Sequence, residues 1–131
     1  MFVMKELNGK FYHIETYGCQ MNVHESEKLR GILSTFGMAE TDDVEQATIV
    51  LFNTCCIREG AEDKAYSNIA HLKKWKQEDP NRIIVVCGCM PQQKNGKYDF
   101  KKRLTFVDIV IGTHNINMLG EYLKRLLKDR K

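Results

Sequence analysis

The sequence predicts an α/β domain in which a parallel β-sheet lies between two layers of helices, a three-layer α/β/α arrangement. Two continuous apolar runs of strand length, Thr48–Asn53 and Ile83–Cys87, are typical of strands that are buried on both faces. Segments in which apolar residues have helical spacing separate these strand-like segments along the chain. The 131 residues suit one domain that is large enough to bury a core.

The first third of the chain predicts a strand, a helix and a short strand. Phe11–Thr16 is rich in residues that favour strands. We expect the helix to begin at Asn22 as its N-cap, with Glu25 completing a capping box, and to end at Gly37. Its buried face is predicted from the helical spacing of Val23, Leu29, Ile32, Leu33 and Phe36. Residues 38–41 are expected to form a short strand.

The rest of the chain continues the same alternation. We expect three further pairs of strand and helix: strands at 48–53, 83–87 and 107–112, followed by helices over Gly60–Gln77, Lys94–Arg103 and Asn115–Lys128, respectively. The first of these helices has an inner stripe of Ala61, Ala65, Ile69, Leu72 and Lys73. With right-handed connections this order predicts a fold that is flavodoxin-like in general form, although the order of the strands in the sheet is not readable from the sequence.

Composition and charge narrow the possible functions. The chain has 20 Lys and Arg against 17 Asp and Glu, and its net charge of +3 is too mild either to indicate or to exclude nucleic-acid binding. No apolar run approaches the ~18 residues that a membrane span needs, and residues 1–13 lack the apolar centre of a secretory signal, so we expect no membrane partner. Five cysteines, an odd number, argue against a secreted disulfide framework and predict a reducing, cytoplasmic location.

Three of the cysteines fall at the same place in the predicted architecture. Cys19, Cys55 and Cys89 each follow a predicted strand by a few residues and lie 36 and 34 residues apart along the chain. Parallel strands end at one edge of a sheet and neighbours lie ~4.8 Å apart, so the three thiols can converge there. Each loop also precedes a predicted helix, whose N-terminus lowers the pKa of a thiol and suits an anionic, sulfur-ligated group.

Three thiolates at such a site leave several chemistries open, because thiolates select zinc, copper(I) or iron–sulfur clusters. A structural zinc site has four ligands, usually in close pairs, and here His24 is a candidate for the fourth. A 4Fe–4S cluster held by three cysteines leaves one iron open to an exogenous ligand. Inert burial is the default for a single cysteine: we expect Cys87 in the core, and we do not expect Cys56 to share a centre with Cys55. A thiol–disulfide module is a further alternative.

Other sequence features point to no further chemistry. The chain contains none of the patterns GxGxxG, GxxxxGK[ST], HExxH and GxSxG. A solvated face, rather than a nucleic-acid surface, is expected for the basic residues Arg58, Lys64, Lys73, Lys74 and Lys76. Trp75 is one aromatic residue among them, too little to indicate a platform for stacking bases. Residues 124–131 are basic and end without a polar tail, which indicates a piece of a longer chain.

The three cysteine-bearing loops carry a family resemblance. Tyr17–Asn22 (YGCQMN), Asn53–Cys55 (NTC) and Gly88–Gln92 (GCMPQ) resemble the N-terminal domain of radical-SAM methylthiotransferases. The resemblance extends over nearly the whole chain, including the spacing between the loops and the late segment Asp108–Gly112. Residues 57–62 (IREGAE) resemble the MiaB-type branch, which modifies tRNA, more than the branch that modifies a ribosomal protein.

The resemblance implies a cofactor and a reaction. It implies that Cys19, Cys55 and Cys89 bind an auxiliary 4Fe–4S cluster and that Cys56 and Cys87 are not ligands. It also implies that the whole enzyme has a radical-SAM barrel, with S-adenosylmethionine and a second 4Fe–4S cluster on a CxxxCxxC motif, and a C-terminal RNA-binding domain. No three cysteines of this chain have that spacing, so residues 1–131 alone are not expected to be catalytic. The implied reaction adds a methylthio group to C2 of an N6-isopentenyladenosine beside the anticodon of tRNA.

The chemistry is consistent with this implied role. Sulfur insertion at an unreactive C–H carbon needs a radical and a sulfur donor, which cofactors supply while the protein positions them. Asn22, Asn53 and Thr54 are candidates, by position, for hydrogen bonds to cluster sulfurs. Two alternatives stay open: a zinc-binding or interaction domain that uses the same three cysteines, and a methylthiotransferase of another branch, with a ribosomal protein or threonylcarbamoyladenosine as substrate.

Overall fold

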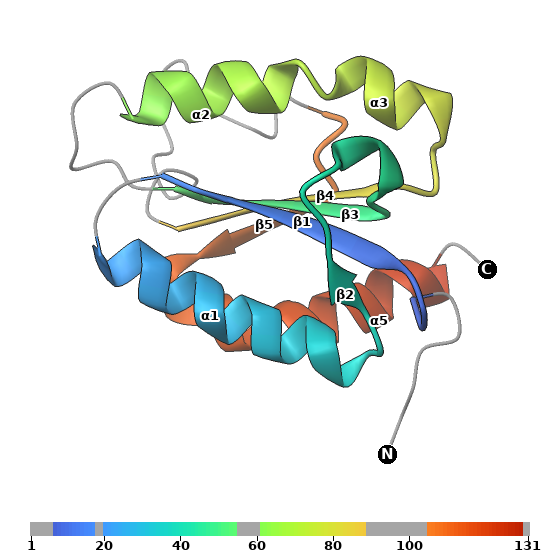
Figure 1. Cartoon of the computed structure of the whole chain (residues 1–131), viewed down its shortest axis with the longest axis horizontal. Helices are drawn as coiled ribbons and strands as arrows, with labels where there is room; N and C mark the ends of the chain where they lie inside the picture. Colours follow the sequence, from blue (N-terminus) through green and yellow to red (C-terminus); the bar gives the residue numbers. More distant parts are fainter. Residues whose placement is uncertain (1–6, 18–19, 55–60, 89–104, 130–131) are drawn as a thin grey trace.

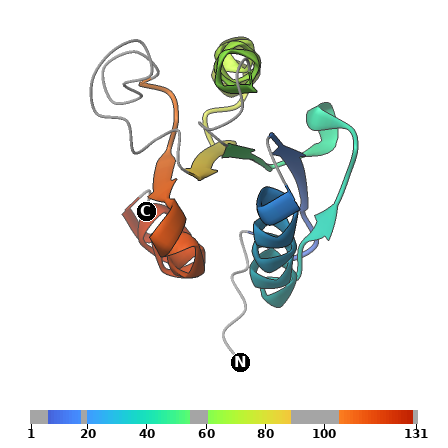
Figure 2. The ribbon, with the colours of Figure 1, turned by 90° about the vertical axis from the view of Figure 1, so that its left-hand side faces the viewer.

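A computed structural model describes residues 7–17, 20–54, 61–88 and 105–129 of the chain. Two helices cover each face of a central sheet, α2 and α3 on one side and α1 and α5 on the other (Figure 1), and the view from the end of the sheet shows the same three layers (Figure 2). The predicted three-layer α/β/α class is therefore confirmed. The elements are β1 Phe11–Thr16, α1 Gln20–Thr35, β2 Ala39–Glu40, η1 Val44–Gln46, β3 Ile49–Thr54, α2 Ala61–Ala70, α3 Lys73–Glu78, β4 Ile83–Gly88, β5 Ile109–Gly112, η3 Thr113–Met118 and α5 Leu119–Asp129.

The sheet has the strand order β2-β1-β3-β4-β5, and every neighbouring pair is parallel. This order is that of flavodoxin-like doubly wound sheets. The chain first moves outward from β1 to β2 and then returns to the other side of β1 with β3. β1 and β3 therefore flank the point where the direction of winding reverses, which is where ligands bind in open α/β sheets.

The hydrophobic core lies on both faces of the sheet, on either side of the neighbouring strands β3 and β4. All six residues of β3 are buried, as the continuous apolar run predicts. Leu51 and Val85 point into the cluster beneath α1 and α5, whereas Phe52 and Val86 point into the cluster beneath α2 and α3. Alternate residues of a strand face opposite sides, so β3 and β4 supply apolar side chains to both layers.

Helix α1 begins at Gln20, two residues earlier than predicted. The prediction that Asn22 is the N-cap with Glu25 in a capping box is therefore wrong, because both residues lie inside the helix. Val23 is half-exposed rather than buried, since at about 100° per residue it lies about 120° around the helix from the buried Leu29. The helix ends at Thr35, and Gly37, with a φ of 81° that suits glycine, follows two residues later as the predicted stop signal.

The single helix predicted over 60–77 is in fact two helices, α2 and α3, separated by residues 71–72. Trp75 supplies the reason. It is six residues from the buried Ile69, which in one straight helix would place it about 120° around the helix axis, away from the buried face. The break between the helices lets Trp75 enter the core, where its indole Nε1 donates to the carbonyl oxygen of Val44 at 2.9 Å.

Two further expectations for this segment are wrong. Lys76 does not lie on a solvated face: its ammonium lies 2.7 Å from Asp108 Oδ2, and both side chains are only 13% exposed. Lys73, which was predicted on the inner stripe, is exposed.

The last helix starts differently from the prediction. Residues 113–118 form the 3₁₀ segment η3, and the α-helix begins only at Leu119. Ile116 and Leu119 are three residues apart, so three residues per turn brings both into the core. The helix expected over 94–103 lies outside the described residues. In the described part of the chain, no helix has the length and apolar character that crossing a membrane requires.

Candidate functional site

The parallel strands bring their carboxyl ends to one edge of the sheet. Residue Thr16 of β1 lies opposite Asn53 of β3, and Thr54 of β3 lies opposite Gly88 of β4. Helices α1 and α2 both begin at this end of the molecule (Figure 1). The last residues of three adjacent strands and the first turns of two helices thus surround the carboxyl edge, on both sides of the switch point between β1 and β3.

The three cysteines that the sequence singles out lie outside the described residues. Along the chain, Cys55 directly follows Thr54 and Cys89 directly follows Gly88, the pair that lies side by side at the ends of β3 and β4. Cys19 comes immediately before the first residue of α1. Among the described residues, no three His, Cys, Asp or Glu side chains form a group that could hold a metal ion.

A row of four side chains crosses the sheet at the last residue of β1 and the last but one of β3, β4 and β5. Thr16, Asn53, Cys87 and Ile111 are aligned in register on β1, β3, β4 and β5. By strand alternation they share the face that α1 and α5 cover, where Cys87 and Ile111 belong to the core. Two members of this row are polar although the face is otherwise apolar, which marks the carboxyl end as chemically distinct.

Ser26 of α1 joins the polar members of the row. Its hydroxyl lies 2.7 Å from the hydroxyl of Thr16 and accepts a hydrogen bond of 3.1 Å from Asn53 Nδ2. Ser26 and Asn53 are completely buried. The buried polar and charged residues in the described part of the chain are Glu25, Ser26, Asn53 and Thr54, and all four lie at this end of the sheet. A polar layer at one end of an apolar core is typical of a binding site.

Glu25 is the unusual member of this polar layer. Its residue is 9% exposed, and its Oε2 is buried without a hydrogen-bond partner among the described residues. Burial raises the pKa of the Glu25 carboxyl above its usual value, although the neighbouring Lys28 and His24 oppose this effect. Buried polar atoms in folded proteins nearly always have partners, so an unpaired carboxyl oxygen at a strand edge requires an explanation.

Cys87 is confirmed as a core residue. It is completely buried, and its thiol donates a 3.5 Å hydrogen bond to the carbonyl oxygen of Phe52. Burial, and then the nearby Glu25 carboxyl, raise the pKa of the Cys87 thiol to about 12. The Cys87 side chain is therefore enclosed in the apolar core, as a buried free cysteine usually is.

The three residues proposed to donate hydrogen bonds to a cluster differ in position. Asn53 faces α1, as described, and Thr54 faces the opposite side, where its hydroxyl donates to the carbonyl oxygen of Cys87 at 2.9 Å. Asn22 lies in the first turn of α1. His24, the candidate fourth zinc ligand, has a side chain that is 69% exposed and lies 4.0 Å from a Glu27 carboxylate oxygen.

Tyr17 ties the end of β1 to helix α2. Its N–H donates to the carbonyl of Asn53 at 2.8 Å, and its ring stacks on Phe52 with 6.4 Å between the centroids. Its hydroxyl donates to Glu15 Oε1 at 3.0 Å and accepts from Asn68 Nδ2 at 2.6 Å. Burial is the main cause that raises the pKa of Tyr17 to about 12. The residue that follows β1 is thus fastened to β3 and to helix α2.

Sequence reasoning missed Glu25, Ser26 and the contacts of Tyr17. The sequence does contain a pattern that indicates Glu25. It lies four residues before Leu29 and eight before Leu33, so helical spacing places a charged residue on the buried stripe of α1. The contacts of Tyr17 with α2 join residues 51 positions apart, and no local pattern indicates them.

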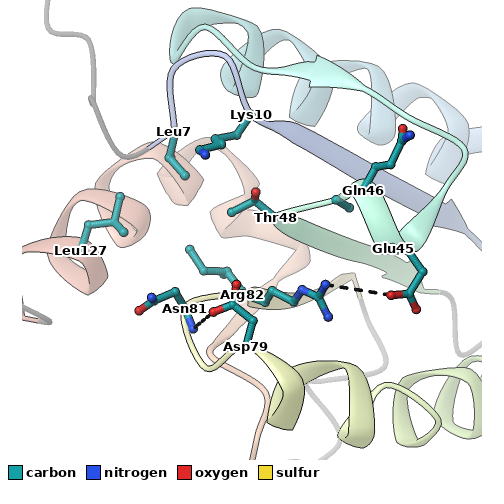
Figure 3. A pocket seen from close by; sticks show the side chains of 11 residues that line it. Leu7, Lys10, Glu45, Gln46, Thr48, Asp79, Asn81, Arg82 and Leu127 are labelled. Carbon is teal, nitrogen blue, oxygen red and sulfur yellow. Dashed lines mark hydrogen bonds and ion pairs between the residues drawn. The ribbon is translucent and has the colours of Figure 1, made fainter.

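A cavity of about 580 Å³ lies at the opposite edge of the sheet (Figure 3). It is lined by residues just before the strands, including Lys10, Thr48 and Arg82. Arg82 is held by structural contacts: its guanidinium lies 4.8 Å from the centre of the Trp75 ring and 4.0 Å from a Glu45 carboxylate oxygen. This amino edge is not where ligands bind in such sheets, so we place the candidate site at the carboxyl edge.

Comparisons with known proteins match this chain to one protein family and to relatives that share one name. The profile of the uncharacterized protein family UPF0004 matches residues 11–112. A tRNA-2-methylthio-N(6)-dimethylallyladenosine synthase from Clostridium botulinum (strain Eklund 17B / Type B) is 47% identical over 124 residues, which are 95% of this chain and 27% of that protein. Proteins with the same name from Clostridium tetani and Caldicellulosiruptor saccharolyticus are 49% and 45% identical, over 97% and 99% of this chain and 28% of each relative. The chain thus spans less than a third of the length of these curated relatives.

Proposed function

Since this chain belongs to the uncharacterized protein family UPF0004 and is related to tRNA-2-methylthio-N(6)-dimethylallyladenosine synthases, we propose that it is the N-terminal domain of a tRNA methylthiotransferase. In this proposal Cys19, Cys55 and Cys89 bind an auxiliary 4Fe–4S cluster. S-adenosylmethionine and a second cluster act elsewhere in the whole protein, and the substrate is an N6-isopentenyladenosine beside the anticodon of tRNA. The domain alone is not catalytic.

The observation that supports the proposal most strongly is the order of the strands. Each of the three cysteines follows one of the strands β1, β3 and β4, and these three strands are consecutive in the sheet, parallel and in register. The sequence predicts neither their adjacency nor their register. Had the order separated these strands, three thiols a few residues past their ends would start too far apart to bind one cluster.

The described surroundings also fit an anionic, sulfur-ligated group. Helix α1, 16 residues long, begins at this edge and has no acidic residue in its first turn, whereas helix α2, 10 residues long, has Glu62 and Asp63 in its first turn. The N-terminal turns present free N–H groups and partial positive charge, which favour a bound anion. With three cysteine ligands, a 4Fe–4S cluster would keep one iron free to present sulfur for transfer.

The residues around the edge have positioning roles in this proposal. The hydrogen bonds among Thr16, Ser26 and Asn53 hold the ends of β1 and β3 against α1. Thr54 and Tyr17 make the corresponding links on the other face, to β4 and α2. Rigid strand ends fix the points at which the chain leaves the sheet before each cysteine, which reduces the entropic cost of bringing three ligands together.

Anaerobic reconstitution with iron and sulfide tests the proposal. We expect about four iron and four sulfide ions per chain, with the Mössbauer signature of a 4Fe–4S cluster. Cys19→Ser, Cys55→Ser and Cys89→Ser should each abolish this signature. Cys87→Ala is the matched control and should retain it, because the Cys87 thiol is buried and hydrogen-bonded within the core.

The alternatives predict different results in the same experiment. A zinc-binding domain would bind one colourless zinc ion per chain in preference to a cluster, with the same dependence on the three cysteines. Equal loss of metal from the Cys87→Ala variant would contradict the ligand assignment. Identity with the relatives favours the isopentenyladenosine substrate over a ribosomal protein or threonylcarbamoyladenosine, because the relatives carry the name of the first activity.

A further inference from the structure

Glu25 is a buried acid for which neither the fold nor the proposed ligand set provides a role. Its residue is 91% buried, since 9% of it is exposed, and it lies on the stripe of α1 that packs against the sheet. An apolar residue at this position would pack without leaving a polar atom unpaired. Rules of local consistency are usually broken at functional sites, so the position of Glu25 at the strand edge directs attention to a bound group.

The described neighbours leave one oxygen of its carboxyl group, Oε2, without a hydrogen bond. The hydroxyl of Ser26, the adjacent residue, is bonded to Thr16 and Asn53. The thiol of Cys87, close enough to interact electrostatically with Glu25, donates instead to Phe52. Oε2 therefore remains without a partner among the described residues. Glu25 belongs to the polar layer because the adjacent Ser26 bonds the ends of β1 and β3.

The charge of the proposed ligand decides which form of the carboxyl group fits. A 4Fe–4S core of charge 2+ with three thiolates carries about one net negative charge. A carboxylate beside it would be a second anion in a poorly solvated place, and like charges there favour the protonated acid. A protonated carboxyl has one O–H donor, and the sulfur atoms of such a cluster accept hydrogen bonds.

We propose that the carboxyl group of Glu25 donates a hydrogen bond to an inorganic sulfur atom of the cluster held at the carboxyl edge. This inference rests on the proposed function and assigns a contact to a residue outside the cysteine motifs. The hydrogen bond stabilises the reduced cluster more than the oxidised one, because the reduced cluster carries more negative charge. Removing the donor therefore lowers the reduction potential of the cluster.

The test compares three variants of this chain after anaerobic reconstitution, with the potential measured by a redox titration followed by electron paramagnetic resonance. Glu25→Leu removes the donor, whereas Glu25→Gln keeps an N–H donor in nearly the same shape. Glu27→Gln, two residues further along the same helix, is the matched control, because the Glu27 side chain is 67% exposed. We expect Glu25→Leu to make one-electron reduction at least about tenfold less favourable, a downward shift of about 59 mV.

Glu25→Gln should retain most of the potential of the unaltered chain, and Glu27→Gln all of it. An unchanged potential in a loaded Glu25→Leu variant would overturn the inference. If Glu25→Leu takes up no cluster, loading of Glu25→Gln with a near-normal potential supports the inference, and failure of both variants overturns it. If the unaltered chain itself takes up no iron and sulfide, the proposed function fails and this inference with it, so the two failures are distinguishable.

Discussion

Replacing Glu25 by leucine should stabilise the metal-free domain. The buried, unpaired Oε2 costs the folded state about 1–3 kcal/mol, the usual penalty for a desolvated polar group without a partner. Leucine keeps the buried stripe of α1 continuous, and its extra apolar burial adds little because the methylene groups of Glu25 already pack there. We therefore expect a gain of about 1–3 kcal/mol in the free energy of unfolding, or about 4 °C in melting temperature per kcal/mol.

The gain should depend on pH in a definite direction. Burial raises the pKa of Glu25 in the folded state, so the folded protein holds this proton more tightly than the unfolded chain. The stabilisation from this proton is fully present below the unfolded pKa of about 4.3 and is lost as pH rises through the folded pKa. The advantage of Glu25→Leu over the unaltered chain should therefore increase as pH rises above about 4.3.

Urea unfolding of both proteins, followed by circular dichroism between pH 4 and pH 8, measures these differences. Glu27→Gln is again the control, and its exposed side chain should change stability by less than about 0.5 kcal/mol. A Glu25→Leu protein that is less stable than the unaltered chain by more than about 1 kcal/mol would refute the reasoning. Such a loss would mean that the carboxyl group has a stabilising partner in the folded domain.

Three further substitutions test the packing that supports the edge. Lys76→Met should lower the free energy of unfolding, measured with urea, by about 3 kcal/mol, because it leaves the Asp108 carboxylate buried beside a neutral side chain. A change near zero would mean that solvent screens the pair. Trp75→Phe should cost about 1–2 kcal/mol in thermal unfolding, since it removes the donor to the Val44 carbonyl, and full stability would contradict the role given to that bond. Gly37→Ala should cost about 1 kcal/mol, as measured by urea unfolding, because φ is 81° there; an alanine that is tolerated without loss would argue against a left-handed helix end.

Much of the fold follows from local pattern. Continuous apolar runs predict β3 and β4, and their burial on both faces, because only a strand covered on two sides requires apolar residues at every position. The spacing of Leu29 and Leu33 predicts the buried face of α1. Helix boundaries follow less well. The break between α2 and α3 arises from the burial of Trp75 against η1, a contact between residues 31 positions apart.

The sequence by itself determined the layer architecture, the position of three cysteines just after strands, and the family resemblance. Each of these features depends on patterns within short segments of the chain. Only the tertiary structure decided the strand order β2-β1-β3-β4-β5, the cross-strand row that includes Asn53 and Cys87, and the burial of Glu25 beside it. The physical reason is that pairing and burial depend on which distant segments share a surface. The sequence alone does not distinguish a glutamate that is exposed to water from one that is buried without a hydrogen-bond partner.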